Sequence, residues 1–177
     1  MKATGIIRRI DNLGRVVIPK ELRKSLHLRE NEPLEIFTDV NGEVVLKKYS
    51  PVGELGRFAQ EYADALNQSL GHTACITDRD IIIAVSGSDK KALLDRHLAP
   101  AIDSMMSERK MMVYSQPLTL TINEDDLYGS MVMSPIITGG DVIGSVILTS
   151  KDSVEMGKLE QKMCETAAGF LARQLEE

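Results

Sequence analysis

Residues 14–24 read Gly-Arg-Val-Val-Ile-Pro-Lys-Glu-Leu-Arg-Lys, and they combine a turn, a short strand and the start of a helix. Pro19 suits the first turn of a helix, because its missing N–H costs nothing there and its φ is already helical. Beyond Pro19, four basic side chains recur at helical spacing: Lys20, Arg23, Lys24 and His27. The pattern predicts a short helix over residues 20–27 with a basic face.

The charge of the chain is divided unevenly along its length. The net charge of −5 is an average, because residues 1–29 hold eight Lys or Arg and only two acids. Residues 51–177 carry 11 basic and 19 acidic side chains. A basic N-terminus on an acidic chain indicates a polyanion partner for that end alone. We therefore expect two functions on two domains.

The first 50 residues are patterned as a β–β–α–β–β unit. Strands are expected at 4–10 and 15–18, and a hairpin at 33–38 and 43–49 turns at Asn41-Gly42. So short a unit, without a disulfide or a metal, rarely buries enough apolar surface to fold alone. Because its apolar residues are nevertheless plentiful, we expect an obligate dimer.

Pro51 and Gly53 end the last of these strands and predict a linker at 51–54. Residues 55–177 then read as helix, hairpin, helices around Pro100, further strands and a final helix at 153–176. The second hairpin joins 130–138 to 142–149 through Gly139-Gly140. This order predicts an α+β domain with an antiparallel sheet flanked by helices.

No motif of catalysis or of metal binding is recognisable. The nucleophile elbow, the zinc-protease helix and the phosphate loop are all missing from the sequence, and the three histidines and two cysteines lack ligand spacing. We expect no enzyme activity, no metal and no cofactor. Cys75 and Cys164 are expected to be reduced core thiols, and the acidic run 123–126 a solvated loop. No apolar run is long enough to cross a bilayer, so we expect no membrane partner and a cytoplasmic, nucleoid-associated protein.

The helices expected at 53–70 and 153–176 both have wide apolar faces. The final helix carries two apolar stripes, of which one can cover the sheet of its own domain. The second packs either on the helix at 53–70 or on a neighbouring subunit. We favour an oligomer contact that joins dimers into a tetramer, through Leu55, Phe58, Tyr62, Met163 and Phe170.

Residues 4–24 closely resemble the AbrB family of bacterial transition-state regulators, through Asp11-x-Leu13-Gly-Arg-Val-Val-Ile-Pro19 followed by Glu21-Leu22-Arg23. The resemblance covers residues 1–50. It implies a β-barrel in which two chains swap their hairpins, and it implies binding to double-stranded DNA. By position, the DNA contacts would be Arg8, Arg15, Arg23 and the basic residue at 24, which is Lys24 here and lacks the bidentate fork of arginine. Arg9 is added to this set for its place in the basic cluster.

The segment from Ser134 to Leu148 is similar to GAF domains, a family of modules that often bind small ligands. Together with the AbrB-like residues it implies a regulator of sporulation genes, activator or repressor, whose domains are 1–50 and 55–177. The second domain would serve assembly or would sense a ligand that the sequence does not identify. A rival hypothesis is an antitoxin-like interaction module, because such barrels also neutralise toxins through a disordered acidic tail.

Overall fold

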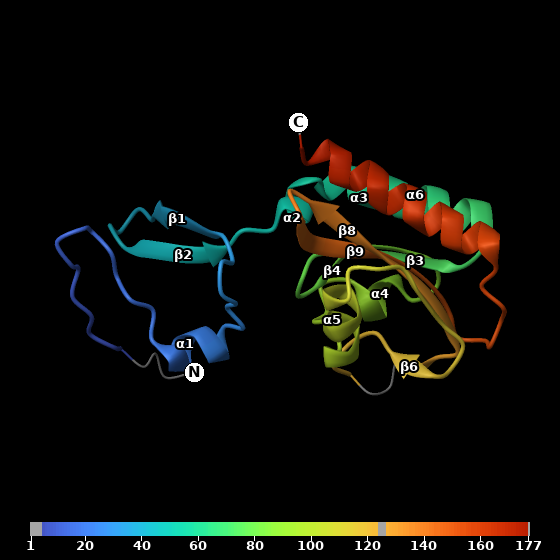
Figure 1. Cartoon of the computed structure of the whole chain (residues 1–177), viewed down its shortest axis with the longest axis horizontal. Helices are drawn as coiled ribbons and strands as arrows, with labels where there is room; N and C mark the ends of the chain where they lie inside the picture. The colour runs from blue at the N-terminus through green and yellow to red at the C-terminus, as the bar shows by residue number, and fades with distance from the viewer. Residues whose placement is uncertain (1–4, 124–126, 177) are drawn as a thin grey trace. The chain divides into compact units, whose positions relative to one another are not determined.

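The computed structural model of the chain describes residues 5–123 and 127–176, so Glu124–Asp126 of the acidic run lie outside the described residues. The chain divides between Tyr49 and Ser50 into two compact units, which are drawn in Figure 1. We call residues 5–49 the N-terminal unit and residues 50–176 the C-terminal unit, and each is described by itself.

The N-terminal unit contains helix α1 (Lys20–Ser25) and one hairpin, β1 (Leu34–Thr38) with β2 (Val44–Lys48). The strands are antiparallel and pair Leu34 with Lys48 and Thr38 with Val44. The turn between them holds Gly42 at φ +82°, a left-handed conformation that explains the glycine. The predicted hairpin is confirmed.

The strands expected at 4–10 and 15–18 are not formed in the single chain. Residues 5–18 hold only the turn at 12–14, and Figure 1 draws them as a loop that leads to α1. A strand needs a neighbour for its backbone N–H and C=O groups, and a single chain offers none here. The helix is also shorter than predicted, because His27 adopts φ +52° and leaves the basic stripe.

The C-terminal unit has a five-stranded antiparallel sheet in the order β4-β3-β9-β8-β5. Its strands are β3 (Thr73–Thr77), β4 (Ile82–Ser86), β5 (Met112–Tyr114), β8 (Ser130–Thr138) and β9 (Asp141–Ser150). Strands β6 (Leu118–Thr119) and β7 (Leu127–Tyr128) form a separate pair. Its helices are α2 (Pro51–Glu54), α3 (Gly56–Leu70), α4 (Lys90–Leu93), α5 (Pro100–Ser107) and α6 (Lys158–Gln174).

Helices cover both faces of this sheet. Helices α3 and α6 lie side by side on one face, and α4 and α5 lie on the other, as Figure 1 shows. Each face has its own apolar core: Ala63, Leu66 and Leu171 belong to the first, and Ile102, Met106 and Ile147 to the second. The predicted antiparallel sheet flanked by helices is confirmed.

Two segments differ from the expectation for this unit. The residues 51–54, predicted as a linker, form helix α2, because the Ser50 hydroxyl accepts the Gly53 N–H at 3.1 Å and Val52 is fully buried. Helix α6 begins at Lys158 rather than near 153. Among the described residues, no helix is long and apolar enough to cross a membrane.

Candidate nucleic-acid interface

A tight turn at Asp11–Gly14 holds the backbone of Arg15. The Asp11 N–H donates to the Arg15 carbonyl and the Gly14 N–H to the Asp11 carbonyl, both at 3.0 Å. Oδ1 of Asp11 also accepts the N–H groups of Leu13 and Arg15, at 2.9 and 2.8 Å. Gly14 has φ +77°, which only glycine adopts without strain. The turn is therefore held by four hydrogen bonds within five residues.

The side chain of Arg15 is tied to the same carboxylate. Its Nε donates to Oδ2 of Asp11 at 2.8 Å, while 71% of the arginine side chain stays exposed. The backbone N–H of Arg15, and then its guanidinium, lower the pKa of Asp11 below its ordinary value. The carboxylate is therefore ionised at neutral pH, and the outer part of the arginine fork faces solvent.

The other predicted DNA contacts are exposed cations of the same unit. Arg23 and Lys24 lie in the last turn of α1, where the helix dipole favours positive charge, and Arg8 and Arg9 precede the turn. Within residues 5–123 and 127–176, these four side chains make no ion pair. Their assignment to DNA stays a prediction, since no nucleic acid is present.

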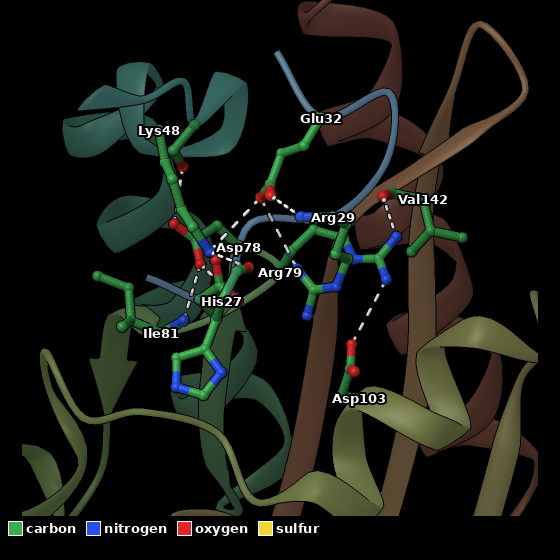
Figure 2. Close-up of polar contacts among 11 residues, drawn as sticks. His27, Arg29, Glu32, Lys48, Asp78, Arg79, Ile81, Asp103 and Val142 are labelled. Atoms are coloured by element: carbon green, nitrogen blue, oxygen red, sulfur yellow. Dashed lines mark hydrogen bonds and ion pairs between the residues drawn. The ribbon is translucent and has the colours of Figure 1, made fainter. Parts of the chain in front are cut away.

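A polar cluster ties the C-terminal end of α1 to the end of β2 (Figure 2). Lys48 Nζ donates to the His27 carbonyl at 2.8 Å and lies 3.6 Å from Glu32. Glu32 also accepts the Arg29 N–H at 2.7 Å. These contacts fix the basic helix against the hairpin, although the unit has little apolar core in a single chain.

A second polar cluster lies at the start of the C-terminal unit. Asp78 accepts the Ser50 hydroxyl at 2.8 Å and the N–H groups of Asp80 and Ile81, both at 2.7 Å. The next residue, Arg79, extends to α5 and β9, as Figure 2 shows. It donates to Asp103 at 3.4 Å and to the Val142 carbonyl at 3.2 Å, whereas its buried Nε has no partner among the described residues.

Of the five residues predicted for oligomer contacts, four lie on α3 and α6, and Leu55 immediately precedes α3. Tyr62 and Phe170 stack with their ring centroids 5.1 Å apart, and Phe58 is 53% exposed. Leu55, Tyr62 and Met163 are half-buried and pack against the core that lies between these helices and the sheet. The side of α6 that packs on the sheet holds Cys164, Ala167, Ala168 and Leu171, all of them buried. Phe58 and Phe170 keep part of their apolar surface in solvent, and we call the surface of α3 and α6 around them the outer face.

The described C-terminal residues form two open hollows of about 360 and 350 Å³ along α6. The space between the sheet and α5 is filled by buried side chains, several of them methionines: Met105, Met106, Met131 and Met133. In the described part of the chain, no group of three or more His, Cys, Asp or Glu could hold a metal.

Both cysteines are free and buried, as expected of core thiols. Burial raises the pKa of each thiol to about 12, and the charge of Asp89 adds to this at Cys75. Cys164 donates to the Val146 carbonyl at 3.1 Å. Neither thiol is a nucleophile at neutral pH.

The sequence reasoning missed the roles of Asp11, Ser50 and Asp78. Asp11 is named above only as part of the AbrB-like motif, although the spacing Asp-x-x-Gly, which occurs at 11–14 and again at 39–42, is a signal for such a turn. Ser50 before Pro51 is a helix-start signal that would have revealed α2. The pairing of Ser50 with Asp78 has no sequence signal, because 28 residues separate them.

The comparisons with known proteins agree with this two-unit structure. Residues 54–176 match the family described as stage V sporulation protein T C-terminal, transcription factor, and residues 7–54 match the MazE family of bacterial antitoxins. The chain is 54% identical to stage V sporulation protein T of Bacillus subtilis, over the full length of both. It is 55% identical to the transition state regulatory protein AbrB of the same organism, over 29% of this chain and 52% of AbrB.

Solved structures show the fold of the C-terminal unit. A GAF domain of a phosphoenolpyruvate-protein phosphotransferase from Coxiella burnetii superposes with a TM-score of 0.57 at 17% identity, covering 69% of this chain and 82% of that one. A free methionine-R-sulfoxide reductase from Thermoplasma acidophilum gives 0.56 at 13% identity, over 71% and 95%. At these identities the likeness concerns the GAF fold alone. By its full-length relative and its matched C-terminal unit, this chain belongs to the stage V sporulation protein T family.

Proposed function

We propose that this protein is a DNA-binding transcriptional regulator of sporulation genes. The observation that carries the proposal is the set of exposed cations in the N-terminal unit, Arg8, Arg9, Arg15, Arg23 and Lys24, on a chain that is otherwise acidic. Several cations on one small unit can neutralise phosphates and release counterions, which is the main source of affinity for DNA. The names of the relatives support this function, and a DNA-bound regulator acts at the nucleoid in the cytoplasm.

Two chains are proposed to share one N-terminal barrel. In the single chain, residues 5–49 expose most of their large apolar side chains, among them Ile7, Val17, Ile36 and Leu46, and only Pro19 is buried. Such a surface is stable in water only if a partner covers it. A second copy covers it with the same residues, and the dimer doubles the number of cations offered to DNA.

Substitution of the cations tests DNA binding directly. Arg23→Ala should weaken binding of the full-length protein and lower the magnitude of its salt slope by about 1, because one phosphate contact is lost. Lys110→Ala, which removes a cation of the C-terminal unit, is the control and should change neither quantity. Fluorescence anisotropy across a salt series measures both the affinity and the salt slope of each variant. Unchanged binding by a folded Arg23→Ala protein would contradict the proposal.

The outer face of α3 and α6 is proposed to join two dimers into a tetramer. Phe58 and Phe170 are large apolar groups left partly in solvent, and Leu159, also on α6, is 63% exposed. Phe58→Asp should therefore convert tetramers into dimers in sedimentation experiments, because a buried, unpaired charge is costly. A tetramer that survives this substitution would leave assembly to the N-terminal unit.

The C-terminal unit is further proposed to sense a small molecule rather than to catalyse a reaction. The GAF fold supports this role, and the methionines between the sheet and α5 can adapt to a guest. Arg79 contacts α5, and Asp78 beside it holds Ser50, the residue that follows the N-terminal unit. Native mass spectrometry of freshly purified protein should show a bound metabolite. If none appears and no metabolite shifts the thermal transition, the unit serves assembly alone.

The match of residues 7–54 to an antitoxin family favours one other function. This antitoxin function has less support than DNA-binding regulation, because residues 50–176 form a folded unit with two buried cores instead of a disordered acidic tail. Purification of the protein from its own cells provides the test. A small toxin that copurifies in fixed proportion would support the antitoxin function.

A further inference from the structure

Two turns of the N-terminal unit have the same backbone geometry. In the second turn, Asp39 N–H donates to the Glu43 carbonyl at 3.0 Å and Gly42 N–H to the Asp39 carbonyl at 3.2 Å. Oδ1 of Asp39 accepts the N–H groups of Asn41 and Glu43 at 2.9 and 2.8 Å. The same four bonds hold the turn at Asp11–Gly14, with the same Asp-x-x-Gly spacing.

The two turns differ in what the second carboxylate oxygen holds. Oδ2 of Asp11 accepts Nε of Arg15, whereas Oδ2 of Asp39 accepts the amide of Asn41 at 3.0 Å. The second turn has Glu43 in the place of Arg15. Because it forms without an arginine, the bond from Arg15 to Asp11 is not needed to make such a turn. That bond instead determines where the guanidinium points.

Electrostatics gives a second reason to assign this bond a role in recognition. A carboxylate 2.8 Å from Nε offsets much of the attraction that Arg15 would exert on phosphates. An arginine that only neutralised phosphate would bind more strongly without such a partner. A fixed guanidinium, in contrast, loses less conformational entropy on binding and meets a planar acceptor pair in one orientation.

We propose that Asp11 is a positioning residue for DNA recognition, which holds Nε of Arg15 so that both terminal nitrogens face one acceptor pair on a base edge. The O6 and N7 atoms of guanine are such a pair. The inference rests on the proposed function, since it requires that Arg15 contact DNA. On this view Arg15 contributes mainly to sequence discrimination, while Arg8, Arg9, Arg23 and Lys24 contribute mainly to overall affinity.

The test compares full-length Asp11→Asn with Asp39→Asn as the matched control. Asparagine can still accept the two backbone N–H groups, but it loses the charge that holds the arginine. Two duplexes are used: one selected from a random library with the unsubstituted protein, and one of the same composition in scrambled order. Asp11→Asn should lower the affinity ratio of selected to scrambled duplex about tenfold, near the lower end of what one bidentate base contact discriminates.

The scrambled duplex should bind Asp11→Asn as well as the original protein or better, because a negative charge is removed near the phosphates. Asp39→Asn should leave the ratio unchanged. Asp11→Ser is the second variant in case the first does not fold, since a hydroxyl also accepts N–H groups in turns. An unchanged ratio in folded Asp11 variants would overturn the inference.

Two Arg15 variants separate this inference from the proposed function. Arg15→Lys keeps the charge without the guanidinium fork, so it should lower the affinity ratio of selected to scrambled duplex as Asp11→Asn does. The double variant should have nearly the same ratio as either single variant. Additive losses would mean that Asp11 does not act through Arg15. Arg15→Ala should weaken binding to both duplexes. If it changes neither affinity, then Arg15 is not a DNA contact and the proposed interface is wrong at that residue.

Discussion

The N-terminal and C-terminal units differ in how much of their apolar surface is buried within a single chain. Residues 50–176 enclose two apolar cores, one on each face of the sheet, with Leu171 and Ile147 fully buried. Residues 5–49 bury only Pro19 and leave Ile7 at 92% and Val17 at 73% exposed. The second unit therefore buries its apolar side chains within one chain, whereas the first leaves most of them exposed, which is the observation behind the proposed shared barrel.

The largest effect is expected for an apolar residue exposed in the N-terminal unit. Val17→Asp looks harmless in the single chain, yet a shared barrel would bury the new charge and could not form. DNA binding and the dimer should both be lost in gel-shift and sedimentation measurements. Val40→Asp is the control, because Val40 lies at the tip of the β1–β2 turn and is fully exposed. Equal tolerance of both substitutions would mean that the unit is stable alone.

A smaller loss is expected in the C-terminal core. Leu171→Ala should lower the free energy of unfolding of this unit by about 2–5 kcal/mol, because it removes a buried side chain and leaves a cavity. Denaturant unfolding followed separately for each unit measures the change. The N-terminal transition should not move, since Leu171 belongs to the other core. A common shift of both transitions would show that the units unfold together.

Ser50→Ala should have a modest effect, about 1 kcal/mol, because it removes the cap of α2 and the bond to Asp78. Thermal unfolding of the C-terminal unit measures this loss. Ser69→Ala, at an exposed position of α3, is the control and should change stability little. No difference between the two variants would mean that water replaces the Ser50 bonds without cost.

The smallest effect concerns the two aspartates of the matching turns. The pKa of Asp11 and that of Asp39 both lie below the ordinary value, for Asp39 mainly because of the Glu43 N–H. A lowered pKa contributes stability above the ordinary value of 3.8, and this contribution is lost as the pH falls through the lowered pKa. The substitution Arg15→Ala should raise the pKa of Asp11 and leave the pKa of Asp39 unchanged. NMR titration of the variant and of the original protein measures both values. Equal changes in the two pKa values would show that the Arg15 guanidinium does not lower the pKa of Asp11.

Much of the fold could be predicted from periodicity and turn residues. The hairpin at Asn41-Gly42, the end of α3 at Gly71 and the hairpin at Gly139-Gly140 are local features, which short stretches of sequence determine. Whether the segments before Pro19 form strands could not be predicted from periodicity and turn residues, because strand pairing depends on a neighbouring strand that one chain does not supply. Helix α2 was missed because Pro51 and Gly53 were interpreted as breakers.

The residues of the candidate site also differ in whether the sequence alone could reveal them. Arg8, Arg9, Arg15, Arg23 and Lys24 could be chosen from charge and resemblance, since their side chains need only be exposed. Asp11 could not be chosen in this way, because its role depends on which of its oxygens the turn occupies and which it leaves to Arg15.

The separation into a basic and an acidic part, the family resemblance and most of the local elements follow from residues that are close together in the chain. Folding in three dimensions brings Arg15 to Asp11, Asp78 to Ser50 and Arg79 to α5, and it sets which side of α6 packs on the sheet. The physical reason is that hydrogen bonds and burial depend on distances and angles between atoms, which only the folded chain defines.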